Sequence, residues 1–180
     1  MENNDIFFVK FPKIYENMGE FKAPKKLEWI ATEKIDGSNF SIYSNGKDTK
    51  FAKRTGFLKS DKWFYNYQSI SIELSIKSSK IYNILHSKDP NIKFIVIYGE
   101  LCGGFYRHPD VEKVQGAVKI QGRVDYHPDN MWVPFDILLR WEDGNRYLMM
   151  QTSVIELCEK FGLPHEQLLF LPWSCSPQPS

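Results

Sequence analysis

The sequence predicts an α+β fold of mainly antiparallel sheets with helices packed outside them. Three observations favour this class: short β-branched and aromatic runs between turn signals, an Asn-Gly hairpin signal, and two segments with apolar residues at helical spacing. The 180 residues suffice for one domain with a core, and 42% hydrophobic residues is ordinary globular usage. We therefore expect a single domain over residues 1–180, with a disordered tail at 172–180 that is poor in core-forming side chains.

The first half predicts a strand followed by a hairpin. Alternating and β-branched residues predict a strand over 27–35 that stops at Asp36-Gly37. A second strand over 40–43 runs into Asn45-Gly46, and residues 50–54 form the expected return strand.

The next two elements are a helical region and a buried strand. Apolar residues at helical intervals predict one or two helices over 63–85. The continuous run Phe94–Tyr98 is typical of a strand buried on both faces, and it ends at Gly99-Glu100.

The last elements are a hairpin and a short helix. Residues 131–139 and 146–149 are predicted to pair across the turn at Asp143-Gly144. Ser153 with Glu156 forms a capping-box pattern, which predicts a helix that ends at Gly162.

Charge and cysteine content exclude several classes of protein. The formal net charge is +1, so any nucleic-acid contact has to come from a local basic patch. Three cysteines and four scattered histidines show no metal-ligand spacing, so metal ligands stay unknown and free thiols are expected. No signal peptide or long apolar run is present, which predicts a soluble, intracellular protein without a membrane span.

Lys34 is a candidate nucleophile at the predicted end of the first strand. It stands in the segment Glu33-Lys34-Ile35-Asp36-Gly37-Ser38-Asn39, beside polar groups able to bind a ligand. A lysine amine must lose its proton before it attacks phosphorus, and burial or a neighbouring cation favours that loss. By itself, such a lysine is more often a solvated strand-end residue, so the hypothesis depends on the other motifs of the chain.

Five segments in order give the chain a resemblance to a known enzyme superfamily. They are 33–39, 51–56, 98–104, 118–129 and 132–137, with the sequences EKIDGSN, FAKRTG, YGELCGG, VKIQGRVDYHPD and WVPFDI. The first, third and fifth resemble motifs I, III and IIIa of the covalent nucleotidyltransferases. The set, over about residues 27–170, resembles the RNA ligases of the nick-sealing and trypanosome editing type.

The resemblance implies a nucleotidyltransferase fold, two packed sheets with ATP and Mg²⁺ between them. It implies that Lys34 forms a lysyl-AMP bond and that AMP passes to an RNA 5′-phosphate, which a neighbouring 3′-hydroxyl then attacks. The implied RNA substrate is nicked or carries those two ends. The resemblance also implies the contacts to the nucleotide. Glu33 and the Ile35 backbone would contact adenine, and Phe135 would stack on it. Asn39 and Arg54 would hold ribose and phosphate, and Glu100 would bind the ribose hydroxyls.

Strand alternation leaves the role of Phe135 open between core packing and stacking on the base. It places Phe135 with Val133 and Ile137 on one face and Asp136 on the other. Pro134 cannot donate a ladder hydrogen bond, so an edge or a bulge is expected there.

Two later family motifs, a Glu-Gly pair with a lysine and a lysine pair, have no match in the sequence. We therefore expect the family pattern to stop after motif IIIa and lysyl-AMP formation by this chain to be weak. Two alternatives stay open. One is a DNA ligase or capping-type enzyme, which Asn39 argues against because those branches typically carry Arg there, and the other is a catalytically impaired nucleotide- or RNA-binding module.

Overall fold

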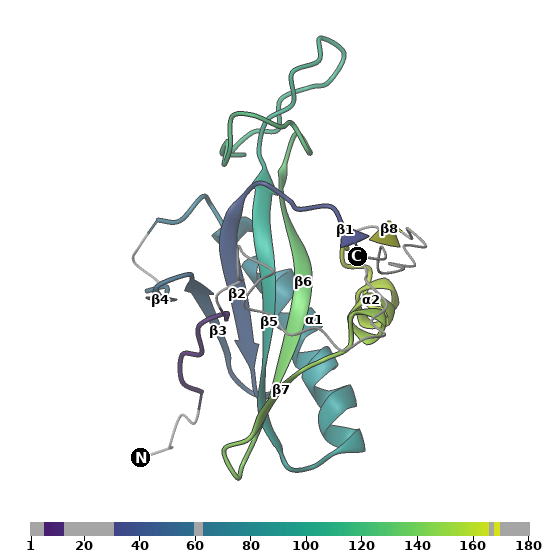
Figure 1. Ribbon diagram of the computed structural model, residues 1–180. Coiled ribbons are helices and arrows are strands. Elements are labelled where there is room, and N and C mark those ends of the chain that lie inside the picture. Colours follow the sequence, from purple (N-terminus) through teal and green to yellow (C-terminus); the bar gives the residue numbers. More distant parts are fainter. Residues whose placement is uncertain (1–5, 13–30, 60–62, 166–167, 170–180) are drawn as a thin grey trace, which may run out of the picture.

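A six-stranded antiparallel sheet forms the centre of the protein (Figure 1). The computed structural model describes residues 6–12, 31–59, 63–165 and 168–169. The elements are β1 (Ala31–Thr32), β2 (Ser38–Ser44), β3 (Thr49–Lys53), β4 (Gly56–Phe57), α1 (Gln68–Lys88), β5 (Ile92–Gly103), β6 (Asn130–Trp141), β7 (Arg146–Leu148), α2 (Gln151–Lys160) and β8 (Leu168–Leu169). The large sheet has the order β4-β3-β2-β5-β6-β7, and β1 pairs with β8 in a second, two-stranded sheet.

Strand β5 is an interior strand of 12 residues, as long as β6, and it pairs with β2 on one side and β6 on the other. Residues 94–98 are almost completely buried, because both faces of the strand are covered by apolar side chains. The predicted doubly buried strand is therefore confirmed, and it extends beyond the apolar run at both ends. Since antiparallel register fixes which residues face each other, β5 determines the position of side chains on both of its neighbours.

The two faces of the sheet bury separate cores. The first core lies under α1 and α2 and includes Phe40, Ile97 and Ile137, with Ile81 and Val154 from the helices. The second core lies on the opposite face and includes Tyr43, Ala52, Val96, Tyr98 and Leu138, with Ile6 and Val9 from the N-terminal segment. Two helices thus cover one face, and the segment 6–12 covers part of the other (Figure 1).

Val9 ties the N-terminal segment to the second core through its backbone. Its carbonyl oxygen accepts hydrogen bonds from the Tyr43 hydroxyl at 2.8 Å and the Tyr98 hydroxyl at 2.9 Å. Burial raises the pKa of Tyr43 to about 12, although its bond to Val9 acts in the opposite direction. Both hydroxyls therefore act as neutral donors.

Most predicted elements of the large sheet are confirmed. The hairpin of β2 and β3 turns at Gly46, which has φ +85, and the Asn45 side chain accepts hydrogen bonds from the Lys47 and Asp48 N–H groups. The strand pair 131–139 and 146–149 corresponds to β6 and β7. The expected α+β class with antiparallel sheets is likewise confirmed, although the second sheet has only two strands in the described residues.

The ends of three predicted elements are wrong. The helical region is one helix, α1, which begins only at Gln68. Helix α2 begins at Gln151, two residues before Ser153, and its N-terminus has no side-chain cap, so the capping-box pattern does not mark its start. Strand β1 ends at Thr32 and the predicted residues 27–30 lie outside the described part. Neither described helix is long and apolar enough to cross a membrane.

Strand β6 contains the bulge that Pro134 predicts. Gly99 pairs with Pro134 and Tyr98 pairs with Asp136, so Phe135 is an extra residue with no partner on β5. Phe135 therefore packs with the second core, whereas Ile137 lies in the first. The prediction that these two side chains share a face is wrong, because simple alternation does not hold across a bulge.

Gly99 is a point where only a hydrogen atom fits between two strands. A Cβ placed there would overlap the Trp132 indole and lie 2.8 Å from the Val133 carbonyl oxygen. The indole N–H donates to the Phe40 carbonyl oxygen at 2.9 Å, so the ring is fixed between β2 and β6. Gly99 thus lets Trp132 connect three strands.

We expect Gly99→Ala to lower the free energy of unfolding by roughly 1–3 kcal/mol, because overpacking displaces a hydrogen-bonded indole from a close-packed core. Urea denaturation followed by tryptophan fluorescence would measure the loss. The matched control is Gly122→Ala, since a Cβ there would have only the Lys119 Cε atom, 4.0 Å away, as a neighbour. Equal stability of the two variants would contradict the account of the β5–β6 contact.

Candidate functional site

The segment that carries Lys34 connects the two sheets. Residues 33–37 lie between β1 and β2 and form no strand, and the side chains of Glu33 and Lys34 are exposed. The prediction of Lys34 at the end of a long strand is therefore wrong within the described residues, because pairing of β1 stops at Thr32. Lys34 is instead on an irregular connection that leads directly into β2.

Gly37 brings this connection against strand β5. A Cβ at Gly37 would overlap the Leu101 carbonyl oxygen and lie 2.8 Å from Glu100 Cγ, so a larger residue does not fit. The Gly37 N–H donates a hydrogen bond to the Glu100 carboxylate. The glycine next to the candidate nucleophile thus holds the Lys34 segment at the Glu100 side chain.

Two residues from the long loop between β5 and β6 hold the same segment from outside. The Gln121 Nε2 amide donates to the Gly37 carbonyl oxygen at 2.9 Å, and the Asp36 N–H donates to the Tyr126 hydroxyl at 2.8 Å. Sequence reasoning assigned no role to either side chain. Their sequence separation of 84 and 90 residues from these partners explains why local patterns did not reveal them.

Glu100 is the electrostatic centre of the site. Burial raises the pKa of Glu100 to about 7, and the charge of Asp36 raises it further, whereas Lys34, Arg54 and the Gly37 N–H lower it. These interactions show that the charges of Lys34, Arg54 and Asp36 all act on one carboxylate. A carboxyl group with such a pKa is only partly ionised at neutral pH, and hydrogen bonds donated by a ligand would stabilise its ionised form.

Asn39 approaches Glu100 from strand β2, and Arg54 approaches it from a turn. Asn39 is the direct register partner of Glu100 in the β2–β5 pair, so the two side chains share the face of the second core. Arg54 is exposed in the short turn between β3 and β4. The structure therefore brings together four predicted residues, Lys34, Asn39, Arg54 and Glu100, whereas Glu33 points to solvent and Ile35 is partly buried.

The bulge places Phe135 on the same face as Glu100. Its ring is partly buried and meets Phe11 edge to face, with 5.2 Å between ring centroids. Phe11 also contacts Tyr98, at 4.9 Å. A base that stacked on Phe135 would thus use the ring surface left by Phe11 or displace that side chain.

Asp136 is a further polar residue of this face that sequence reasoning did not single out. Burial raises the pKa of Asp136 to about 6, while the Ile137 N–H donates to its Oδ1 atom at 2.9 Å and lowers the pKa. It is the register partner of Tyr98, two residues from Glu100 along β5. This placement depends on the bulge, which turns Phe135 and Asp136 to the same face, and simple alternation along the strand does not predict it.

Metal ligands and thiols add no second reactive centre to the described residues. No group of three or more His, Cys, Asp or Glu side chains lies close enough there to hold a metal ion. Cys102 follows Glu100 but is buried, and burial raises the pKa of its thiol to about 11. The interpretation of Cys102 as a packed residue agrees with this inert thiol.

Comparison with known proteins identifies the family. A family model described as RNA ligase matches residues 27–173. The chain belongs to the RNA ligase family. A similar curated protein is RNA-editing ligase 2, mitochondrial, from Trypanosoma brucei brucei, 34% identical over 149 residues that cover 74% of this chain and 36% of the relative. RNA-editing ligase 1 from the same organism is 33% identical over 92 residues, covering 48% of this chain and 20% of that protein.

A solved structure supports the fold of this RNA ligase family member. An RNA ligase from Naegleria gruberi, solved with ATP and Mn, superposes with a TM-score of 0.50 at 13% identity. The match covers 78% of this chain and 36% of that chain. The chain therefore shares the ligase fold over most of its length and spans about a third of the proteins that it resembles.

The raised pKa of Glu100 predicts how stability depends on pH. The folded state favours the neutral form of this carboxyl. The resulting contribution to the free energy of unfolding is fully present below the unfolded pKa of about 4.3, and it is lost as the pH rises to about 7. Glutamine cannot ionise. We expect the stability of Glu100→Gln relative to the wild type to rise by about 1–3 kcal/mol between pH 5 and pH 8.

Urea denaturation at four pH values between 5 and 8 would measure this difference. Glu112→Gln is the control, since Glu112 is an exposed carboxylate of the loop between β5 and β6. Stability profiles of wild type and Glu100→Gln that stay parallel across this range would show that Glu100 is not desolvated in the folded protein.

Proposed function

We propose that this chain carries the nucleotide-binding part of an ATP-dependent RNA ligase, with Lys34 as the residue that accepts AMP. The observation that carries the proposal is the convergence of Lys34, Arg54 and Asp36 on the partly buried Glu100. Family membership supports the reaction class, since the match includes all of these residues. We further propose that residues 1–180 form part of one nucleotidyltransferase domain; the predicted tail at 172–180 lies outside the described residues.

In the proposed reaction, the Lys34 amine attacks the α-phosphorus of ATP. The new N–P bond replaces the bond to pyrophosphate, which leaves, and the lysine loses its proton. Arg54 suits the phosphate because a guanidinium donates to two oxygens in fork geometry. Glu100 suits the ribose because its carboxylate accepts hydrogen bonds from hydroxyl groups, and Asn39 lies beside it to donate or accept.

The remaining proposed contacts concern the base, the metal and the RNA. Phe135 offers an aromatic face to adenine, and Glu33 with the Ile35 backbone supplies polar contacts to its edge. A divalent cation such as Mg²⁺ would neutralise phosphate charge, and its protein ligands are not assigned. AMP then passes to an RNA 5′-phosphate, the phosphate bond to Lys34 breaks, and a 3′-hydroxyl displaces AMP to join the ends.

RNA is the proposed substrate in preference to DNA. The curated relatives are RNA-editing ligases, and their names describe joining of RNA. Asn39 agrees with this choice because it has the residue type of the RNA ligase branch. The proposed intracellular location agrees with a reaction that uses ATP and RNA ends.

We expect Lys34→Arg to bind ATP like the wild type and to form no covalent AMP adduct. Arginine keeps the positive charge near Glu100, but a guanidinium with a pKa above 12 is not a nucleophile. Intact mass after incubation with ATP and magnesium, with peptide mapping of any adduct, is the measurement. An AMP adduct on the variant, or on a lysine other than Lys34 in the wild type, would contradict the assignment.

Arg54→Ala is expected to weaken ATP binding about tenfold to a hundredfold, the effect of losing one hydrogen-bonded charge contact of roughly 1.5–3 kcal/mol. Since Arg54 is exposed, the melting temperature without ligand should stay nearly unchanged. Isothermal titration with ATP and magnesium would measure both variants, with Arg54→Lys as a control that keeps charge and loses the fork. If Arg54→Ala binds ATP like the wild type, Arg54 is not a phosphate contact.

A further inference from the structure

The loop of residues 104–129 between β5 and β6, here called the β5–β6 loop, projects beyond the sheet (Figure 1). Its base is closed by backbone bonds from the Gly104 N–H to the Asp129 carbonyl oxygen at 2.9 Å and from the Ile120 N–H to the Gly103 carbonyl oxygen at 3.3 Å. The buried Asn130 side chain adds a reciprocal pair with the backbone of Val118, at 2.9 and 2.7 Å. Such a loop is held in shape before it meets a ligand.

The β5–β6 loop has balanced charge, and three of its four acidic side chains contact neighbouring groups. It contains four basic residues, Arg107, Lys113, Lys119 and Arg123, and four acidic ones, Asp110, Glu112, Asp125 and Asp129. Asp125 forms an ion pair with Arg107 at 2.8 Å, Asp129 accepts a hydrogen bond from the Asn130 N–H at 2.7 Å, and Asp110 lies 3.7 Å from His108. Lys113 and Lys119 form no ion pair with a described carboxylate.

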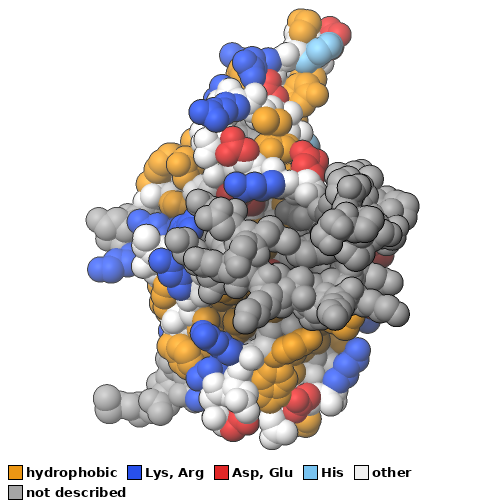
Figure 2. Space-filling model, viewed as in Figure 1, with side chains coloured by type: hydrophobic (Ala, Val, Ile, Leu, Met, Phe, Trp, Pro, Cys, Tyr) orange, Lys and Arg blue, Asp and Glu red, His pale blue; other side chains and the backbone are white. Residues whose placement is uncertain are grey.

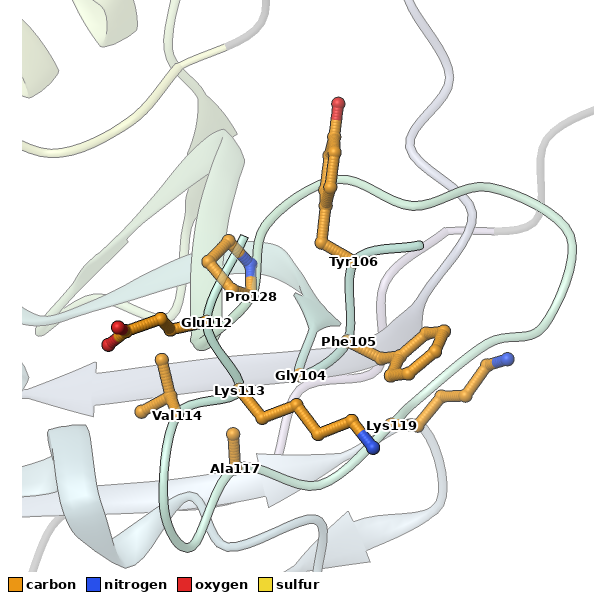
Figure 3. A pocket seen from close by; sticks show the side chains of 9 residues that line it. All are labelled: Gly104, Phe105, Tyr106, Glu112, Lys113, Val114, Ala117, Lys119 and Pro128. Carbon is orange, nitrogen blue, oxygen red and sulfur yellow. The ribbon is translucent and has the colours of Figure 1, made fainter. Parts of the chain in front are cut away.

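These two lysines line a cavity of about 240 Å³ in the loop. Figure 3 shows both side chains extending along one side of it, with Phe105 between them and the Glu112 carboxylate at the opposite end. The Lys119 ammonium lies 4.7 Å from the centre of the Phe105 ring. The volume is below the roughly 300 Å³ at which sites for larger ligands begin, so it suits a single base or phosphate and not a whole nucleoside triphosphate.

Exposed apolar and aromatic side chains accompany the cations. Tyr106 and Val114 both line the cavity and are 39% and 38% exposed. In the space-filling view, lysine and arginine side chains gather on the projecting end of the molecule, among hydrophobic ones (Figure 2). Cations together with an exposed aromatic ring are the combination that binds single-stranded nucleic acid, where phosphates meet the cations and bases stack on the ring.

The loop also contacts the segment that carries Lys34. Gln121 and Tyr126 hold Gly37 and Asp36 by the two hydrogen bonds described above, at 2.9 and 2.8 Å. An RNA strand bound along the β5–β6 loop would therefore pass from the loop close to the proposed adenylation site. Proximity of this kind is what an RNA end needs before its phosphate receives AMP.

We infer that the β5–β6 loop is an RNA-binding subsite that holds an unpaired nucleotide near the end to be joined. Lys113 and Lys119 contact its phosphates, and Tyr106 stacks on a base. This inference rests on the proposed function, which it deepens by assigning a place for the RNA that is separate from the ATP site at Glu100.

The test is fluorescence anisotropy with a short, labelled, single-stranded RNA that carries a 5′-phosphate. Lys113→Ala is expected to weaken binding several-fold at low salt and to reduce the slope of log K against log salt by about 0.7, the value of one lost phosphate contact. Tyr106→Ala is expected to weaken binding fivefold or more. Lys80→Ala on α1 and Tyr147→Ala on β7, both exposed residues away from the loop, are the matched controls.

A second measurement keeps the inference testable if a variant misfolds. RNA containing 4-thiouridine, cross-linked to the wild-type protein, should attach within residues 105–119. Loop variants that bind RNA like the controls, or cross-links confined to other segments, would overturn the inference. Failure of the wild type to bind RNA would overturn it too, whereas ATP titration on the same sample decides the proposed function independently.

Discussion

The pairing of β5 with both neighbours is the constraint on which the rest of the molecule depends. Its central residues are buried on two faces, so a shift of one residue in register would move every apolar side chain to the wrong core. The same register sets Asn39 opposite Glu100 and leaves room for Gly37 at the end of the β2–β5 pair. Hydrophobic packing therefore determines the positions of the functional side chains.

Positioning by packing has an electrostatic consequence at Glu100. The strand that orders this carboxylate also removes part of its hydration, and the charges of Lys34 and Arg54 offset that loss only in part. A ligand that donates hydrogen bonds to Glu100 and presents phosphates to the two cations would satisfy all three groups. Without ligand, the incompletely compensated Glu100 carboxylate therefore lowers the stability of the fold, as is common at functional sites.

The sequence predicted the elements whose signals are local. The turn at Asn45-Gly46 and the apolar run of β5 depend on neighbouring residues, so periodicity and turn chemistry identified both. The motif match also selected Lys34, Asn39, Arg54 and Glu100, which lie near one another in the fold and whose roles stay predictions.

Features that arise from tertiary packing were not predictable. The bulge at Pro134 was anticipated, but its effect on Phe135 depends on which residue pairs with β5. The contacts of Gln121 and Tyr126 with the Lys34 segment join residues far apart in the chain, and helix α2 starts before its capping pattern because packing overrides that local signal.

Hydrogen–deuterium exchange with and without saturating ATP and magnesium tests the central claim most directly. If nucleotide binds at the meeting of the Lys34 segment with β5, amides of residues 36–40 and 99–101 should become more protected, while the far hairpin of β6 and β7 stays unchanged. Protection absent from these two segments, with nucleotide bound, would contradict the account.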